Sequence, residues 1–121
     1  KGRKVAIWGL AFKPETDDMR ESPALILIDR LLKAGCSVCV YDPVAMNECR
    51  RRIGDAVEYA RNLYDTVIEA DAIFHVTEWK EFRMPSWGVI KKAMKPEAVL
   101  IDGRNVFSSS DLEGISYLRI G

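Results

Sequence analysis

The sequence lacks an excess of charge of either sign, a long apolar run and a dense set of cysteines. Its 121 residues include 18 basic and 18 acidic side chains, so the formal net charge is zero. A balanced surface provides no positive field for nucleic acid or for an anionic membrane. No apolar run approaches the about 20 residues that a membrane-spanning helix requires. We therefore expect a globular protein that binds neither nucleic acid nor membrane.

Cysteine and histidine are scarce, which leaves few side chains for metal or redox chemistry. Cys36 and Cys39 form a C-x-x-C pair, but Cys39 lies in the alternating run SVCVYD, and no second pair completes a zinc site. We interpret Cys39 as a small buried apolar residue. The odd number of cysteines, with Cys49 as the third, is typical of a reducing compartment, here the cytoplasm. The only histidine, His75, has no nucleophile beside it in AIFHV, and we interpret it as a packed side chain.

The opening stretch KGRKVAIWGL has no long apolar segment and no small-residue cleavage site, so we expect no signal peptide. A strand pattern begins by the fourth residue. The length suits one domain. We expect residues 1–121 to form a single domain excised from a longer protein.

Short strand patterns alternate with helix patterns along the chain. Strands are predicted at 4–8, 37–41, 57–59, 72–76, 98–101 and 115–120, and helices at 23–34, 44–53, 62–70, 79–82 and 87–94. This alternation predicts an α/β fold: a three-layer, Rossmann-like domain with a mostly parallel sheet of about six strands. Right-handed crossovers favour the strand order 3-2-1-4-5-6.

Two of the predicted helices begin with cap signals. Ser22 precedes a proline at the first helical position, and Asn62 has an acidic residue three positions later. In the second of these helices we expect Leu63, Val67 and Ile68 to point inward. Arg50–Arg52, at the end of the helix predicted at 44–53, is interpreted as a solvated basic face.

The predicted strand order places a crevice between the first and fourth strands at their carboxyl ends. Segments 10–21, 77–87 and 102–110 are expected to face it. Trp79 and Trp87 in the second segment either line the crevice or anchor irregular helices, and packing is the favoured interpretation. Asp42 ends the second strand, where a dinucleotide fold places its ribose-binding acid. Without a matching glycine-rich loop, we interpret Asp42 as a turn residue.

The loop after the first strand lacks the glycines that a dinucleotide fold needs. GLAFKP stands where G-x-G-x-x-G is expected, so we expect this loop to reach a ligand with side chains. Lys13 is a point charge suited to phosphate, and Phe12 offers an apolar plate to a sugar or base. Arg20 has a planar fork for a phosphate or for Asp17 and Asp18. The alternative is a solvated loop with internal ion pairs.

A second cation follows the fifth predicted strand in VLIDGRNVF. Gly103 permits a sharp turn that brings Arg104 to the same edge as Lys13. Two strand-end cations that converge on one crevice suit an anionic ligand. The alternative is a local pair between Arg104 and an aspartate.

Three motifs carry a resemblance to a known family. They are GLAFKPETDDMRESPA at 9–24, TEWKEF at 77–82 and DGRN at 102–105. Together they resemble the carboxyl-terminal, UDP-binding domain of the UDP-glucose/GDP-mannose dehydrogenase family, over essentially the whole chain. TEWKEF favours the members that oxidise UDP-glucose to UDP-glucuronate. By this resemblance Phe12, Lys13 and Arg104 contact the UDP-sugar, and Arg20 reaches an NAD bound mainly by another domain.

The resemblance also implies what this chain does not contain. Family members transfer two hydrides to two NAD⁺, and a cysteine thiolate in a central domain attacks the aldehyde stage. That cysteine motif and the NAD-binding glycine motif are both missing here, so no catalytic residue is assigned and the chain alone is expected to be inactive. The partners implied are a UDP-sugar and the other domains of the same enzyme, which is expected to be a homodimer. FSSSDL at 107–112 departs from the family pattern and leaves the uracil contacts open.

Three alternatives remain. The chain could be the same domain of a UDP-N-acetylmannosamine or GDP-mannose dehydrogenase, since these share the core of the first motif. It could be a non-catalytic α/β interaction module, but a response-regulator-like domain needs an acidic group where WGL ends the first strand. A free-standing NAD-dependent oxidoreductase is disfavoured by the missing glycines.

Overall fold

The computed structural model describes residues 2–11, 22–77, 79, 82, 85–102 and the backbone of 116–119. Six strands form one parallel sheet with the order β3-β2-β1-β4-β5-β6, which confirms the predicted order 3-2-1-4-5-6. The strands are β1 (Lys4–Trp8), β2 (Ser37–Tyr41), β3 (Glu58–Tyr59), β4 (Ala72–His75), β5 (Val99–Asp102) and β6 (Ser116–Arg119). The helices are α1 (Pro23–Lys33), α2 (Met46–Ile53), α3 (Leu63–Thr66) and α4 (Trp87–Ala93).

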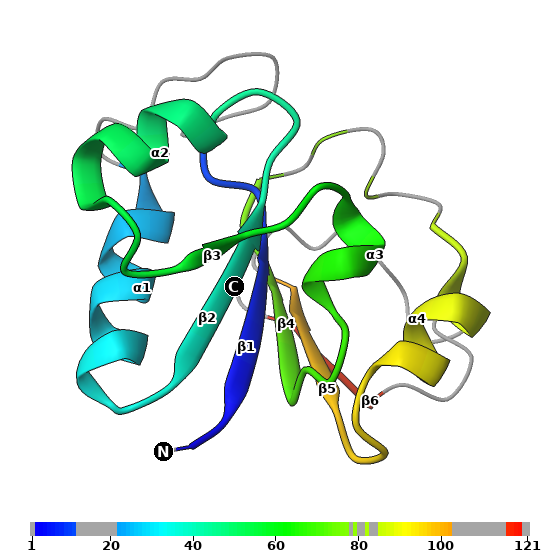
Figure 1. Ribbon diagram of the computed structural model, residues 1–121. Coiled ribbons are helices and arrows are strands. Elements are labelled where there is room, and N and C mark those ends of the chain that lie inside the picture. The colour runs from blue at the N-terminus through cyan, green and yellow to red at the C-terminus, as the bar shows by residue number, and fades with distance from the viewer. Residues whose placement is uncertain are drawn as a thin grey trace.

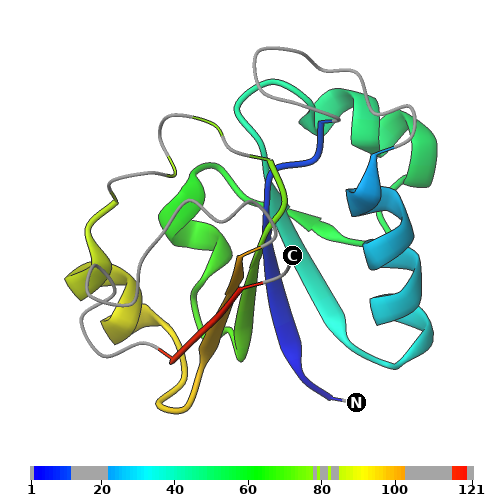
Figure 2. The same cartoon turned by 180° about the vertical axis from the view of Figure 1, so that it is seen from behind.

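The helices lie on both faces of the sheet and give three layers. Figures 1 and 2 show α1 and α2 on one side and α3 and α4 on the other. Successive residues of a strand point to opposite faces. Val5 and Ile7 accordingly pack with the residues of α1 and α2, whereas Ala6 and Trp8 pack with those of α3 and α4. A sheet buried on both faces explains why its strands read as nearly continuous apolar runs.

The first helix forms where its cap signals predict it. Ser22 is the N-cap of α1, and its hydroxyl oxygen accepts a hydrogen bond from the amide of Ala24 at 3.2 Å. Pro23 occupies the first helical position, where an amide N–H would have no hydrogen-bond partner within the helix, so its absence costs nothing. Ala24 and Ile28 are buried against the sheet. Gly35 follows the helix with a φ of 88°, a conformation that glycine adopts without strain.

The third helix is shorter than predicted. Asn62 caps it as expected and accepts the amides of Tyr64 and Asp65, both at 2.9 Å. The helix ends at Thr66 and not near residue 70, because the chain turns through Glu69 with a φ of 58°. Leu63 and Val67 are buried as predicted. The inward placement of Ile68 is wrong: the turn leaves this side chain 48% exposed.

The basic end of α2 lies at the surface, as predicted. Glu48 accepts hydrogen bonds from Arg51 at 2.6 Å and from Arg52 at 2.7 Å, and these two guanidinium groups lower the pKa of Glu48 to about 2. The guanidinium of Arg50 lies 4.3 Å from the centre of the Tyr59 ring. In the part of the chain that the structure describes, no helix has the length and apolar character to cross a membrane.

Candidate ligand-binding edge of the sheet

The four central strands end in one line. In the strand register, Tyr41 of β2 pairs with Trp8 of β1, Trp8 with His75 of β4, and His75 with Asp102 of β5. We call this line of strand ends the carboxyl edge. Neighbouring parallel strands lie about 4.8 Å apart, so the chain leaves β1 and β5 at points separated by about 10 Å. The carboxyl edge is where open parallel sheets bind ligands.

Aromatic side chains close one face of the carboxyl edge. Phe82 stacks on Trp8 with ring centroids 5.2 Å apart and an interplanar angle of 11°. The same ring meets Tyr41 and His75 edge-on, at 6.0 and 5.8 Å. Trp87 packs against Trp8 at 5.9 Å. These contacts fill the α3 and α4 face of the sheet with packed rings at the carboxyl edge.

The two tryptophans after β4 serve packing, as favoured from the sequence. Trp79 and Trp87 are 6% and 5% exposed and belong to the core on the α3 and α4 face. Trp8 anchors the same region, because its indole N–H donates to the Thr66 hydroxyl at 2.9 Å. The crevice-lining alternative for Trp79 and Trp87 is therefore not needed.

Asp42 has a larger role than the predicted turn residue. Its carboxylate is fully buried. Oδ1 accepts the amides of Val44 and Ala45, both at 2.8 Å, which is the expected turn. Oδ2 accepts three donors from distant segments: the amides of Leu10 at 2.8 Å and Ala11 at 3.2 Å, and the indole N–H of Trp79 at 3.0 Å. Asp42 thus joins the segments that follow β1, β2 and β4.

Residues 9–11, which we call the loop entry, are also held from other sides. The Ser22 hydroxyl donates to the carbonyl of Leu10 at 2.7 Å, and the Thr77 hydroxyl donates to the carbonyl of Ala11 at 2.8 Å. The amide of Gly9 donates to the carbonyl of Tyr41 at 2.8 Å. All three side chains that hold the loop entry, from Asp42, Ser22 and Thr77, are buried.

Gly9 itself is required by close packing. Its φ is +100°, and a Cβ built on it would lie 2.4 Å from Thr77 Cβ and 2.5 Å from the Thr77 amide nitrogen. No side chain fits at these distances. Gly9 is therefore needed because the end of β1 packs directly against the chain that follows β4.

His75 and Asp102 form a buried pair at the carboxyl edge. His75 Nδ1 lies 3.1 Å from Asp102 Oδ1, and both side chains are fully shielded from solvent. The pair confirms the packed interpretation of His75. It also fixes the last described residue of β5, directly before the segment that carries Arg104.

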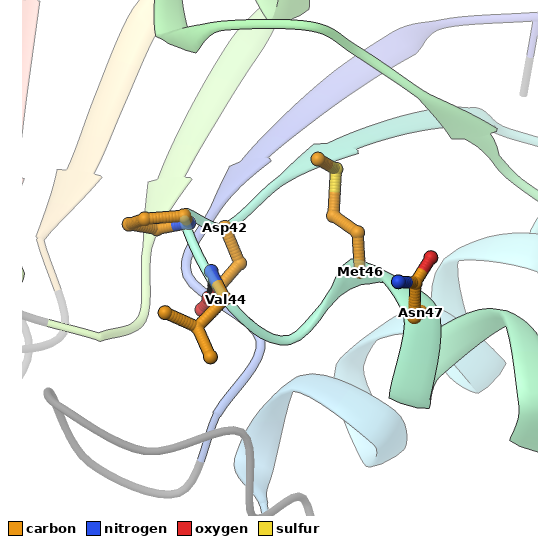
Figure 3. Close-up of a pocket in the computed structure, with 5 residues that line it drawn as sticks. Asp42, Val44, Met46 and Asn47 are labelled. Atoms are coloured by element: carbon orange, nitrogen blue, oxygen red, sulfur yellow. Dashed lines mark hydrogen bonds between the residues drawn. The ribbon is translucent and has the colours of Figure 1, made fainter.

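A small pocket opens where β2 passes into α2. It measures about 120 Å³ and is lined by Asp42, Pro43, Val44, Met46 and Asn47. Figure 3 shows Val44, Met46 and Asn47 around this turn. Val44 is 50% exposed, so the pocket is a shallow surface hollow.

The cysteines show no sign of catalytic activation. Burial is the largest cause that raises the pKa of Cys39 and of Cys49, so both thiols stay protonated near neutral pH. Cys36 is half-buried, and all three cysteines are free. Among the described residues, no group of three or more His, Cys, Asp and Glu side chains is placed to hold a metal ion.

The predicted ligand-binding side chains lie outside the described residues. This applies to Phe12, Lys13, Arg20 and Arg104, so their assignment stays a prediction. The strand ends that precede them do meet at one edge, as the predicted strand order requires. Asp42 was not identified from the sequence, because its donors lie 31, 32 and 37 residues away. Its place at the end of the second strand was the available signal.

Known proteins resemble this chain over nearly its whole length. Residues 6–109 match the UDP-glucose/GDP-mannose dehydrogenase family, UDP binding domain. A UDP-glucose 6-dehydrogenase from Pseudomonas aeruginosa is 42% identical over 100% of this chain and 28% of its own length. The chain thus spans about a quarter of the length of the curated relatives it matches.

Solved structures give the same picture. A UDP-glucose dehydrogenase from Pyrobaculum islandicum superposes with a TM-score of 0.81 at 31% identity, over 98% of this chain and 25% of its own. An NDP-N-acetyl-D-galactosaminuronic acid dehydrogenase from Methanosarcina mazei superposes with a TM-score of 0.82 at 35% identity, over 100% of this chain and 24% of its own. The chain therefore belongs to the UDP-glucose/GDP-mannose dehydrogenase family and corresponds to its UDP binding domain.

Proposed function

We propose that this chain is the nucleotide-sugar-binding domain of an NAD-dependent UDP-glucose 6-dehydrogenase, which converts UDP-glucose to UDP-glucuronate. The observation that carries the proposal is the match of residues 6–109 to the UDP binding domain, because this range includes both loops predicted to bind the ligand. Curated relatives at 42% and 41% identity are UDP-glucose 6-dehydrogenases. The whole enzyme would be a cytoplasmic homodimer. Its other domains would contribute most of the NAD-binding site and the catalytic cysteine.

The strand register supports a shared role for the two loops. Trp8 and Asp102 both pair with His75, so the segments that follow β1 and β5 start about 10 Å apart on the same edge. Lys13 follows the first of these strand ends by five residues, and Arg104 follows the second by two. A diphosphate carries negative charge on both of its phosphates, so one cation from each loop suits it.

The roles proposed for the loop residues follow from their chemistry. Lys13 and Arg104 bind the diphosphate, the first as a point charge and the second as a bidentate fork. Phe12 packs against the sugar or base. Arg20 extends toward the NAD in the neighbouring domain. The chain alone performs no oxidation, because the groups that accept hydride and attack the aldehyde lie in other domains.

Titration of the isotope-labelled chain with UDP tests the proposal. We expect millimolar or weaker binding, with amide shifts that cluster at residues 12, 13 and 104. A hydrogen bond to a charged group contributes about 1.5–3 kcal/mol, so Lys13→Ala or Arg104→Ala should weaken UDP binding about tenfold to 100-fold. Lys33→Ala is the matched control, since this lysine is exposed and forms a local ion pair with Asp29, one helical turn away in α1.

A UDP titration without shifts in these residues would refute the proposal. Equal UDP affinity in the three variants would refute the assignment of Lys13 and Arg104 alone. In the complete enzyme, the two substitutions should raise the KM for the nucleotide sugar, whereas Arg20→Ala should act more on the use of NAD.

The second candidate is the same domain of a dehydrogenase for an N-acetylated sugar nucleotide. The structure from Methanosarcina mazei, whose name specifies such a sugar, favours it with a TM-score of 0.82. Titration of the complete enzyme with UDP-glucose, UDP-N-acetylmannosamine and GDP-mannose separates the candidates. Tighter binding of UDP-glucose than of either other compound is expected. Tighter binding of UDP-N-acetylmannosamine would replace the first candidate with the second, and tighter binding of GDP-mannose would refute both.

A further inference from the structure

The buried carboxylate of Asp42 accepts hydrogen bonds from backbone amides that, in dinucleotide-binding folds, bind the ligand. In such folds the amides of the first turn bind the pyrophosphate, and the acid after the second strand binds a ribose hydroxyl. Here the corresponding acid, Asp42, points at the loop after β1. Its Oδ2 accepts the amides of Leu10 and Ala11, at 2.8 and 3.2 Å.

No acceptor capacity remains on this carboxylate for a ligand. An ionised carboxylate offers about four lone-pair sites, and Asp42 already receives five N–H donors. All five distances lie between 2.8 and 3.2 Å, the normal range for N–H···O bonds. Asp42 therefore neither binds a ribose nor leaves the two loop amides open to a pyrophosphate.

The same contacts tie the two ends of segment 12–21 together. Ala11, before the segment, is held by Asp42 and by the hydroxyl of Thr77. Ser22, after the segment, donates to the carbonyl of Leu10 at 2.7 Å and caps α1. Both points where the segment joins the fold are thus fixed by buried hydrogen bonds.

We propose that Asp42 is a positioning residue for nucleotide-sugar binding: an internal anion that occupies the amides of the loop entry and so fixes the start of the segment carrying Phe12 and Lys13. This inference rests on the proposed function. Fixing a binding loop before the ligand arrives lowers the conformational entropy lost on binding. It also converts the loop from recognition through backbone amides to recognition through side chains.

The substitution Asp42→Asn tests the role of the charge. The asparagine NH₂ must face N–H donors on one side, so one set of amides loses its acceptor. A small displacement of binding groups has large effects on function, and we expect UDP affinity to fall about tenfold or more. Affinity for inorganic phosphate, which needs only one cation, should change less than about twofold, because phosphate makes no demand on the alignment of the two loops.

Two further variants keep the test decisive. Thr77→Val removes only the hydroxyl that holds the Ala11 carbonyl, and we expect about a threefold loss of UDP affinity. Asp71→Asn is the matched control, because Asp71 accepts the amide of Lys4 at 2.9 Å at the opposite edge of the sheet. It should leave UDP affinity unchanged even where it lowers the unfolding midpoint as much as Asp42→Asn.

Binding is measured by NMR titration at a temperature where each variant is folded, with the 10 and 11 amides as reporters. If Asp42→Asn does not fold, Thr77→Val decides. Unchanged UDP affinity in the folded variant, or equal losses for UDP and phosphate, would overturn the inference. A wild-type chain that shows no response to UDP would instead refute the proposed function itself.

Discussion

Replacing Gly9 with alanine tests how closely the loop entry approaches the chain after β4. The new Cβ would lie 2.4 Å from Thr77 Cβ and 2.5 Å from the Thr77 amide nitrogen, at a φ of +100°. The positive φ costs a residue with a side chain about 1–2 kcal/mol. The overlap adds about 1–3 kcal/mol, because one of the atoms it meets belongs to the backbone. We expect a loss of about 2–5 kcal/mol in the free energy of unfolding.

The control for this substitution is Gly54→Ala. Gly54 also has a positive φ, +62°, but a Cβ there would meet nothing within 4 Å. It measures the cost of a side chain in a positive-φ conformation without a steric contact, which we expect to be about 1–3 kcal/mol. Urea unfolding followed by tryptophan fluorescence measures both variants, because Trp8 precedes Gly9 and is buried. Equal losses for the two variants would show that the contact with Thr77 does not constrain the loop entry.

Three further predictions follow from the described residues. At pH 8, a thiol reagent should modify Cys36 first, whereas Cys39 and Cys49 should react only when the chain unfolds; modification of all three at one rate in the folded chain would contradict their burial. The amide of Lys4 and the side chain of Lys95 lower the pKa of Asp71, so its contribution to stability is present above the unfolded pKa and is lost as pH falls. The urea midpoint should therefore fall less between pH 7 and 3 in Asp71→Asn than in the wild type, and parallel curves would refute this. Ser22→Ala should lower the free energy of unfolding by about 1 kcal/mol or more through loss of the α1 cap, measured by the same unfolding experiment.

The parts of the fold that were predicted from the sequence have strong local signals. Lys4–Trp8 and Ser37–Tyr41 were predicted with the bounds that the structure gives, because short apolar runs between turn residues read clearly as buried strands. The alternation of elements and the handedness of crossovers then determined the strand order. Ser22 and Asn62 were recognised as caps because the capping bonds are local.

What could not be predicted depends on contacts between distant residues. The α3 pattern continued past Thr66, but the turn at Glu69 ends the helix and exposes Ile68. Asp42 was recognised only for its local turn, since its donors from Leu10 and Trp79 depend on how β1, β2 and β4 are juxtaposed. The assignment of Lys13 and Arg104 came from motifs and remains a prediction, because both lie outside the described residues.

The shortness of β3 has a consequence for how this domain behaves in solution. β3 contributes only Glu58 and Tyr59 to one margin of the sheet. An edge strand this short exposes too few backbone donors and acceptors to pair with a strand of another molecule. Short edge strands are one way in which natural sheets avoid edge-to-edge aggregation. Lengthening β3 with β-branched residues should therefore promote self-association.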